Sequence, residues 1–267
     1  MLNIAHRGAR SIAPENTLLA ARKGLEAGAD LWETDIGVTR DEQLILCHDT
    51  SLRRTTDVDL KFPERAKASY AHFTLAEIRT LDAGSWFVET DPFGQIAAGA
   101  LSPAEERACR SEKVPTLEEA LVWTRATDWI VNLELKRLPA SMARFPLVER
   151  VLSMIDRVGI TPERVRLSSF YHPWLKEVLS LRPDVSVQAL IGEKAYLALD
   201  WGSLEFETYN VRHSLISDDE IRRRKEQGLA INLFTVNDAA DMCRYRQLGV
   251  DGIFTDFPQR LALLLGK

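Results

Sequence analysis

The sequence has few of the features that would place this chain in a membrane or outside the cell. It has only three cysteines, Cys47, Cys109 and Cys243, an odd number without the spacing of a metal site. No apolar run approaches the ~20 residues that span a bilayer. The first residues also lack the basic and long apolar regions of a secretory signal. These absences predict reduced thiols, no stable membrane insertion and a cytoplasmic location.

The sequence also lacks a strong excess of one charge. The formal net charge is -5 and no cluster of five or more like charges occurs, so nucleic acid is not an expected partner. An anionic substrate would need a local positive site. The 267 residues, 45% of them hydrophobic, can build one large core. The sequence leaves open whether the chain forms a homo-oligomer.

Eight short apolar segments alternate with helical segments along most of the chain. Strands are expected at 2–5, 30–38, 128–135, 165–169, 185–191, 206–210, 229–235 and 250–255. Helices are expected at 15–27, 115–121, 145–158, 173–181, 218–227, 239–248 and 258–265. Strands separated by helices run parallel, so the pattern predicts a single α/β domain, residues 1–267, folded as a TIM (β/α)8 barrel. An open doubly wound sheet is disfavoured because no G-x-G-x-x-G stretch follows the first strand.

The segment 49–114 interrupts this alternation and is expected to be a small insertion after the second barrel strand. It is polar and irregular, with a single short helix expected at 75–81. It follows a hairpin whose returning strand, 43–48, carries His48 back to the end of the second barrel strand. Ordered connections of this length are usually functional, so the insertion is expected to cover the site.

Polar side chains gather where the first three barrel strands end, which is where such barrels carry their chemistry. Residues two apart on a strand face the same side, so Glu33 and Asp35 project together, and so do Glu134 and Lys136. The candidates are His6 and Arg7 from the first strand, Glu33 and Asp35 from the second, and Glu134 and Lys136 from the third.

Three carboxylates on neighbouring strands would repel one another unless a cation lies between them. Oxygen ligands without cysteine suit a hard divalent cation, Mg²⁺ or Ca²⁺. Such a cation, with the guanidinium of Arg7 and the ammonium of Lys136, would supply positive charge for a phosphate. His6 and His48 would supply a proton donor and a proton acceptor, which completes the groups needed for phosphodiester cleavage.

Each candidate also has a plain structural interpretation. The three acids could form surface salt bridges, although inward-facing acids at barrel strand ends need compensation. Lys136 could be a counter-ion to Glu134, and His48 could be an ordinary loop histidine. The pair Arg53 and Arg54 could be a solvated turn.

The motifs, taken in order, resemble the glycerophosphodiester phosphodiesterase family nearly from end to end. They are His6-Arg7-Gly8, Pro14-Glu15-Asn16-Thr17, Glu33-x-Asp35, His48-Asp49, Leu52-x-Arg54-Thr55-Thr56, Leu81-Asp82-Ala83-Gly84-Ser85-Trp86-Phe87, Pro115-Thr116-Leu117-x-Glu119, Glu134-Leu135-Lys136 and Asp251-Gly252-Ile253-x-Thr255-Asp256-x-Pro258.

The resemblance implies a TIM-barrel hydrolase that converts small glycerophosphodiesters to sn-glycerol 3-phosphate and an alcohol. It further implies one divalent cation, Mg²⁺ or Ca²⁺, together with a set of site residues. These are the metal ligands Glu33, Asp35 and Glu134, the acid/base histidines His6 and His48, and the phosphate-binding residues Arg7 and Lys136.

The sequence departs from the family pattern at three positions. Trp32 and Thr34 flank Glu33 where aliphatic residues are expected, and Phe234 stands where a tryptophan is frequent. These differences bear on substrate shape rather than on the reaction.

A lysophospholipase D-like activity on lipids is the alternative enzymatic function. A catalytically dead barrel used for binding would need a missing metal ligand or a missing histidine. The insertion is expected to set the size of the accepted alcohol.

Overall fold

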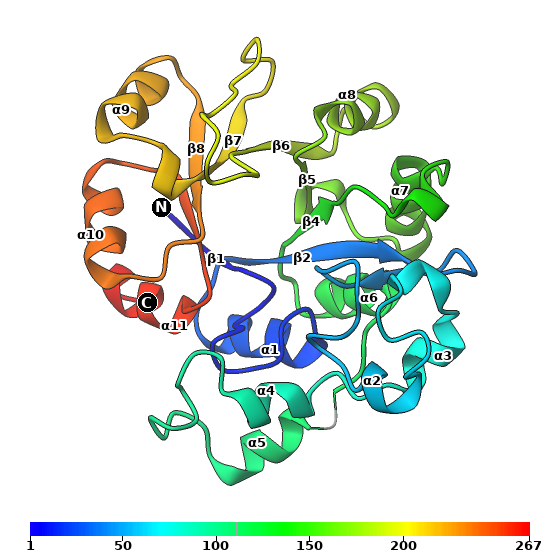
Figure 1. Cartoon of the computed structure of the whole chain (residues 1–267). Helices are drawn as coiled ribbons and strands as arrows, with labels where there is room; N and C mark the ends of the chain where they lie inside the picture. The colour runs from blue at the N-terminus through cyan, green and yellow to red at the C-terminus, as the bar shows by residue number, and fades with distance from the viewer. Residues whose placement is uncertain (111) are drawn as a thin grey trace.

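The computed structural model describes residues 1–110 and 112–267 and confirms the predicted barrel. Eight parallel strands form a closed ring with helices outside it (Figure 1). The ring closes because β1 pairs with both β2 and β9. In chain order its strands are β1 (Leu2–Ala5), β2 (Leu31–Val38), β4 (Val131–Leu135), β5 (Val165–Ser169), β6 (Ser186–Ile191), β7 (Thr208–Arg212), β8 (Ala230–Phe234) and β9 (Gly252–Thr255).

Seven helices follow the barrel strands or precede the next ones. They are α1 (Leu18–Glu26), α6 (Leu117–Ala126), α7 (Leu147–Val158), α8 (His172–Leu181), α9 (Asp218–Glu226), α10 (Ala239–Gln247) and α11 (Pro258–Leu265). The predicted cap of α6 is confirmed, because the Thr116 side chain accepts a hydrogen bond from the Glu119 N–H. Residues 192–207 join β6 to β7 without a helix.

Two element boundaries differ from the sequence prediction in ways that matter for the site. The first helix was expected from residue 15, but Thr17 is its N-cap and accepts from the Ala20 N–H, so α1 starts at Leu18. Glu15 and Asn16 therefore precede the helix. The strand expected at 206–210 lies at 208–212, which places Arg212 at its C-terminal end.

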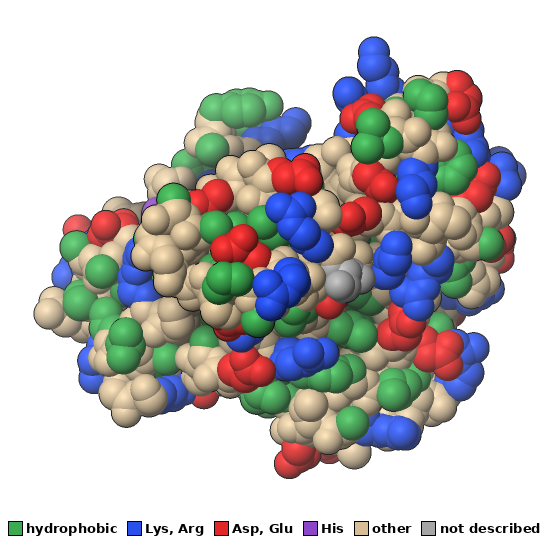
Figure 2. Space-filling model, turned by 90° about the horizontal axis from the view of Figure 1, so that it is seen from below, with side chains coloured by type: hydrophobic (Ala, Val, Ile, Leu, Met, Phe, Trp, Pro, Cys, Tyr) green, Lys and Arg blue, Asp and Glu red, His purple; other side chains and the backbone are tan. Residues whose placement is uncertain are grey.

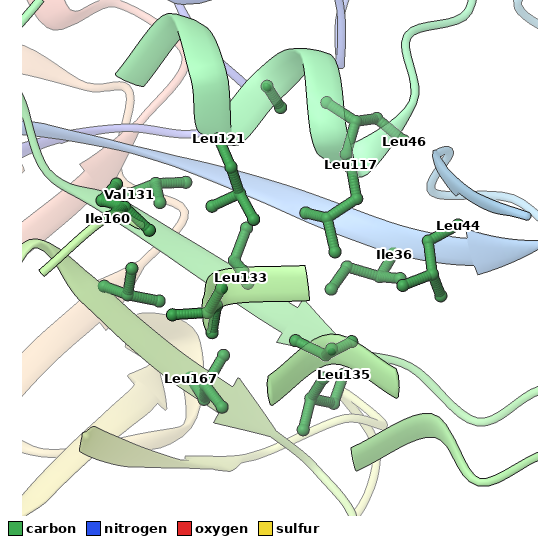
Figure 3. Packing of buried hydrophobic residues seen from close by; sticks show 14 of the residues in the cluster. Ile36, Leu44, Leu46, Leu117, Leu121, Val131, Leu133, Leu135, Ile160 and Leu167 are labelled. Atoms are coloured by element: carbon green, nitrogen blue, oxygen red, sulfur yellow. The ribbon is translucent and has the colours of Figure 1, made fainter. Parts of the chain in front are cut away.

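The main core lies between the barrel strands and the outer helices. Val131, Leu133 and Leu135 of β4 point towards this layer, where Leu117 and Leu121 of α6 meet them (Figure 3). The alternate β4 residues therefore face the barrel axis. Full burial of an aliphatic side chain contributes roughly 1.5–3 kcal/mol, so this layer fixes the strands whose other faces carry the site.

The described residues of the insertion form four α-helices rather than the one predicted. They are α2 (Val58–Lys61), α3 (Leu75–Thr80), α4 (Ser85–Thr90) and α5 (Pro103–Cys109). Capping boxes at Thr74 and Ser102 explain α3 and α5, since each reciprocally pairs with a glutamate three residues on. The insertion follows the short antiparallel strand β3 (Leu44–Leu46), and α4 and α5 lie beside α1 (Figure 1).

On the face shown in Figure 2, basic and acidic side chains are interspersed and form no single basic patch. Among the described residues, no helix has both the length and the apolar character needed to cross a membrane.

Candidate active site

The three predicted metal ligands come together where β4 ends, two from the middle of β2 and one from the C-terminal end of β4. Asp35 is the register partner of Glu134 across the two strands, and Glu33 lies one inward-facing position earlier. One carboxylate oxygen from each of the three lies within 4.8 Å of the others. Glu33 and Asp35 are buried and Glu134 is nearly so. The surface salt-bridge interpretation is therefore wrong for this cluster.

Hydrogen bonds hold the three carboxylates but leave one atom unpartnered. The Arg7 backbone N–H donates to Glu33 at 2.9 Å, and the Asn16 side-chain amide donates to Asp35 Oδ2 at 3.0 Å. Lys136 Nζ lies 3.3 Å from Glu134 Oε1 and 3.4 Å from Asp35 Oδ1. Asp35 Oδ1 is nevertheless buried and accepts no hydrogen bond. An orphaned carboxylate oxygen among three acids fits a hard cation.

The pKa values show that the cluster is short of positive charge. Burial raises the pKa of Glu33 well above its usual range, and the charges of Asp35 and Glu134 raise it further. Burial likewise raises the pKa of Glu134, against the opposing effect of Lys136. Burial would also raise the pKa of Asp35, but Lys136 and Arg7 outweigh it and hold that pKa below its usual range. A divalent cation would allow all three to ionise.

His6 is held at the end of β1 by an acid from the other end of the chain. Its Nδ1 lies 2.7 Å from Asp256 Oδ1, and the Asn237 side chain donates to Asp256 Oδ2 at 2.7 Å. Burial, followed by the charge of Arg7, lowers the pKa of His6 to about 4. The ring is therefore neutral near pH 7. Because Nδ1 must donate to the Asp256 carboxylate, Nε2 is left as a proton acceptor.

His48 is held by an acid next to it in the sequence. Its Nδ1 lies 2.6 Å from Asp49 Oδ1, and Arg54 Nε donates to Asp49 Oδ2 at 2.6 Å. Arg54 also donates to Glu15 at 2.6 and 2.8 Å. Through these contacts Asp49 fixes the orientation of the His48 ring. The solvated-turn interpretation of Arg54 is wrong, whereas the one acidic partner of Arg53 among the described residues is the exposed Asp59.

Glu15 joins the phosphate-binding candidate Arg7 to the insertion. Arg7 Nη1 donates to Glu15 at 2.9 Å, while Arg7 Nε lies 3.3 Å from Asp35. Burial opposes ionisation of Glu15, but hydrogen bonds from Arg54 and the charge of Arg7 lower its pKa to about 2. Gly8, at φ +81°, permits this arrangement, since an added Cβ would lie 2.4 Å from the Ala20 backbone. The sequence analysis gave no role to Glu15, although it lay in a quoted motif.

A cavity of about 480 Å³ opens onto these groups. His6, Arg7, Glu33, His48, Glu134 and Lys136 all line it, so six of the seven predicted site residues face one space. Asp35 lies behind this wall, bonded to Asn16. The rest of the wall comes from the ends of β4 to β8 and includes Arg137, Phe170, Tyr171, Leu190, Arg212 and Phe234. The sequence analysis did not assign Arg137 or Arg212.

The lining of this cavity does not support the expectation that the insertion covers the site, and its effect on the size of the accepted alcohol stays a prediction. Within 49–110 and 112–114, no described residue lines the cavity. The insertion instead reaches the site through Asp49 and Arg54, which fix His48 and Glu15.

Comparison with known proteins gives consistent matches along the whole chain. The glycerophosphoryl diester phosphodiesterase family matches residues 6–260. The glycerophosphodiester phosphodiesterase of Caldanaerobacter subterraneus is 32% identical over 100% of this chain and 98% of its own length. That of Bacillus subtilis is 31% identical over 97% of this chain and 84% of its own length.

The fold is matched by solved structures as well. An Oleispira antarctica phosphodiesterase, solved with the product sn-glycerol 3-phosphate, has a TM-score of 0.78 at 23% identity and covers 99% of this chain and 96% of its own. That structural similarity shows the fold, and the sequence matches show the family. Together with the residues that the barrel gathers at one cavity, they show that this chain belongs to the glycerophosphoryl diester phosphodiesterase family.

Proposed function

We propose that this protein is a metal-dependent hydrolase that converts glycerophosphodiesters to sn-glycerol 3-phosphate and an alcohol. The observation that carries the proposal is the buried triad Glu33, Asp35 and Glu134. Asp35 Oδ1 accepts no hydrogen bond there, and two histidines face the adjoining cavity. The Oleispira relative bound to sn-glycerol 3-phosphate is consistent with that product.

Glu33, Asp35 and Glu134 would hold the cation, and their oxygen donors favour a hard ion such as Mg²⁺ or Ca²⁺. When bound, the cation supplies positive charge that stabilises negative charge on the phosphate oxygens. Lys136 would bind the phosphate from the same side. Arg7 Nη1 is bonded to Glu15 and Nε lies 3.3 Å from Asp35, so Nη2 is the nitrogen that would donate to the substrate.

The two histidines would divide the proton transfers. His6 is neutral and its Nε2 is an acceptor, so it would take the proton of the attacking hydroxyl. His48, whose ring Asp49 orients, would donate a proton to the leaving alcohol. Neither ring is hydrogen-bonded to a serine or cysteine among the described residues, which disfavours a covalent enzyme intermediate.

The attacking hydroxyl could come from water or from the substrate. We favour the 2-hydroxyl of the glycerol group, because it is already held next to phosphorus and would form a cyclic phosphate that water then opens. This route explains why a glycerol group is required and gives each histidine the reverse task in the second step. A substrate with hydrogen in place of the 2-hydroxyl tests it. Turnover near that of the parent, at comparable binding, would replace it with direct attack by water.

The experiment that tests the proposed function is product analysis on a panel of substrates. Glycerophosphocholine, glycerophosphoethanolamine and glycerophosphoglycerol should each give sn-glycerol 3-phosphate, with Ca²⁺, Mg²⁺ or Mn²⁺ supplied separately. Release of a phosphorylated alcohol and free glycerol would mean that the opposite ester bond is cleaved, and would reject the proposed reaction.

A lysophospholipase D-like activity is a second candidate because of one surface feature. Tyr196 is 79% exposed and Leu197 53% exposed, and Leu197 lines a second cavity next to the first. Such an apolar rim could contact an acyl chain. Hydrolysis of a lysophospholipid in the same panel tests this second activity.

A cytoplasmic location and homo-oligomerisation stay predictions.

A further inference from the structure

Two arginines face the cavity away from the carboxylate triad. Arg137 follows Lys136 at the end of β4, and Arg212 is the last residue of β7. A second cavity of about 530 Å³ adjoins the first, and the two share Arg137, Tyr171 and Glu193 in their walls. The phosphate-binding groups lie at one end of this combined space. The part of the substrate that leaves would therefore extend along the arginine wall.

Aromatic rings and backbone carbonyls hold the two guanidinium groups in place. Arg212 donates to the Gly192 carbonyl and, at 3.0 Å, to that of Glu193, and lies 5.4 Å from the Phe234 ring centre. Gly192, at φ +86°, allows this packing, because an added Cβ would lie 2.7 Å from Arg212 Cβ. The Arg137 guanidinium lies 4.9 Å from the Tyr171 ring centre.

Neither guanidinium has an acidic partner. Within residues 1–110 and 112–267, no carboxylate lies within ion-pairing distance of Arg137 or Arg212. This contrasts with Arg7 and Arg54, which are neutralised by Glu15 and neighbouring acids. Glu193 is the acid on this wall of the first cavity, so the two arginines give the wall an excess of positive charge.

We propose that Arg137 and Arg212 form a subsite for an anionic group on the leaving alcohol, either a carboxylate or a phosphate. A planar guanidinium with free N–H groups is suited to both anions. The inference rests on the proposed function and specifies its substrate class. Glu193 adds an acceptor beside the arginines, so an alcohol carrying both a carboxylate and an ammonium, as in glycerophosphoserine, matches this wall.

The test compares two substrates that differ only by a carboxylate. Glycerophosphoserine should be hydrolysed with a kcat/KM about tenfold above that of glycerophosphoethanolamine, the range for an exposed charge-assisted contact. Arg137→Gln should remove most of this preference and leave the ethanolamine substrate within about twofold of the parent protein. Arg137→Lys should retain part of it. Arg144→Gln, an exposed arginine outside both cavities, is the matched control.

A third substrate, whose leaving alcohol carries a phosphate, distinguishes the two anions. A preference for either anionic substrate that Arg137→Gln removes and Arg144→Gln does not supports the proposal, and raising the ionic strength should weaken it. Equal kcat/KM for all substrates, or an equal loss on all of them in Arg137→Gln, would overturn the subsite while leaving the hydrolase intact. Failure to hydrolyse any substrate would instead count against the proposed function.

Discussion

Without a cation, ionisation of the Glu33 carboxyl group is unfavourable in the folded protein. Burial and the charges of Asp35 and Glu134 raise its pKa in the folded chain. A carboxyl group with a raised folded-state pKa contributes stability below its unfolded pKa, near ~4.3, and this contribution is lost as the pH rises through the folded value. The metal-free protein at pH 7 is therefore destabilised by Glu33.

Glu33→Gln should therefore raise the melting temperature of the metal-free protein at pH 7, by about 3 °C for each kcal/mol relieved. The gain should shrink as the pH falls towards 5. Asp35→Asn is the matched control with the opposite sign, because the ion pairs of Asp35 with Arg7 and Lys136 lower its pKa. Thermal unfolding with and without Mg²⁺ or Ca²⁺ measures both. A cation that stabilises Glu33→Gln as much as the parent protein would exclude Glu33 as a ligand.

The two histidines make a second prediction at this scale. His6→Ala and His48→Ala should each lower kcat by ~10²-fold or more, since each would remove one proton-transfer group. His72→Ala, a histidine of the insertion that bonds to Ser69, should leave kcat unchanged. The pH–rate profile of the parent protein should be bell-shaped. Near-normal kcat in either of the first two variants would remove that histidine from the mechanism.

At the scale of elements, the spacing of the apolar residues correctly predicted that each barrel strand exists. It predicted the first and last residues of the elements less accurately. The alternation in β2 and β4 correctly placed Glu33, Asp35 and Glu134 on the inward faces. The boundary of α1 depended on the Thr17 cap rather than on the apolar stripe. Arg212 was missed because β7 ends two residues later than predicted. This shift places a different side chain, that of Arg212, at the cavity.

The insertion makes a third prediction. Arg54→Gln would break the bonds to Asp49 and Glu15, and should lower kcat/KM by roughly tenfold through a less ordered His48 and Arg7. The loss should be the same on every glycerophosphodiester, because the insertion does not line the cavity within the described chain. Arg53→Gln, which affects only an exposed pair with Asp59, is the control. A substrate-dependent loss would support a role for the insertion in selectivity.

At the scale of the whole molecule, barrel closure builds the site from distant parts of the sequence. Pairing of β1 with β9 brings His6 to Asp256, 250 residues away. Local patterns predicted both strand ends, and local patterns together with the family resemblance predicted the roles of His6 and His48. Neither could show the contacts of Asp256, Glu15 or Arg54, because these depend on how the ring closes and on where the insertion folds back.

The central claim is that catalysis depends on a cation held by Glu33, Asp35 and Glu134. The measurement that tests it most directly is release of sn-glycerol 3-phosphate from glycerophosphocholine by protein whose metal content has been removed and verified by elemental analysis. We predict that turnover is lost in excess chelator and restored by Mg²⁺ or Ca²⁺ in the parent protein but not in Glu134→Gln. Full turnover by the verified metal-free protein would contradict this account.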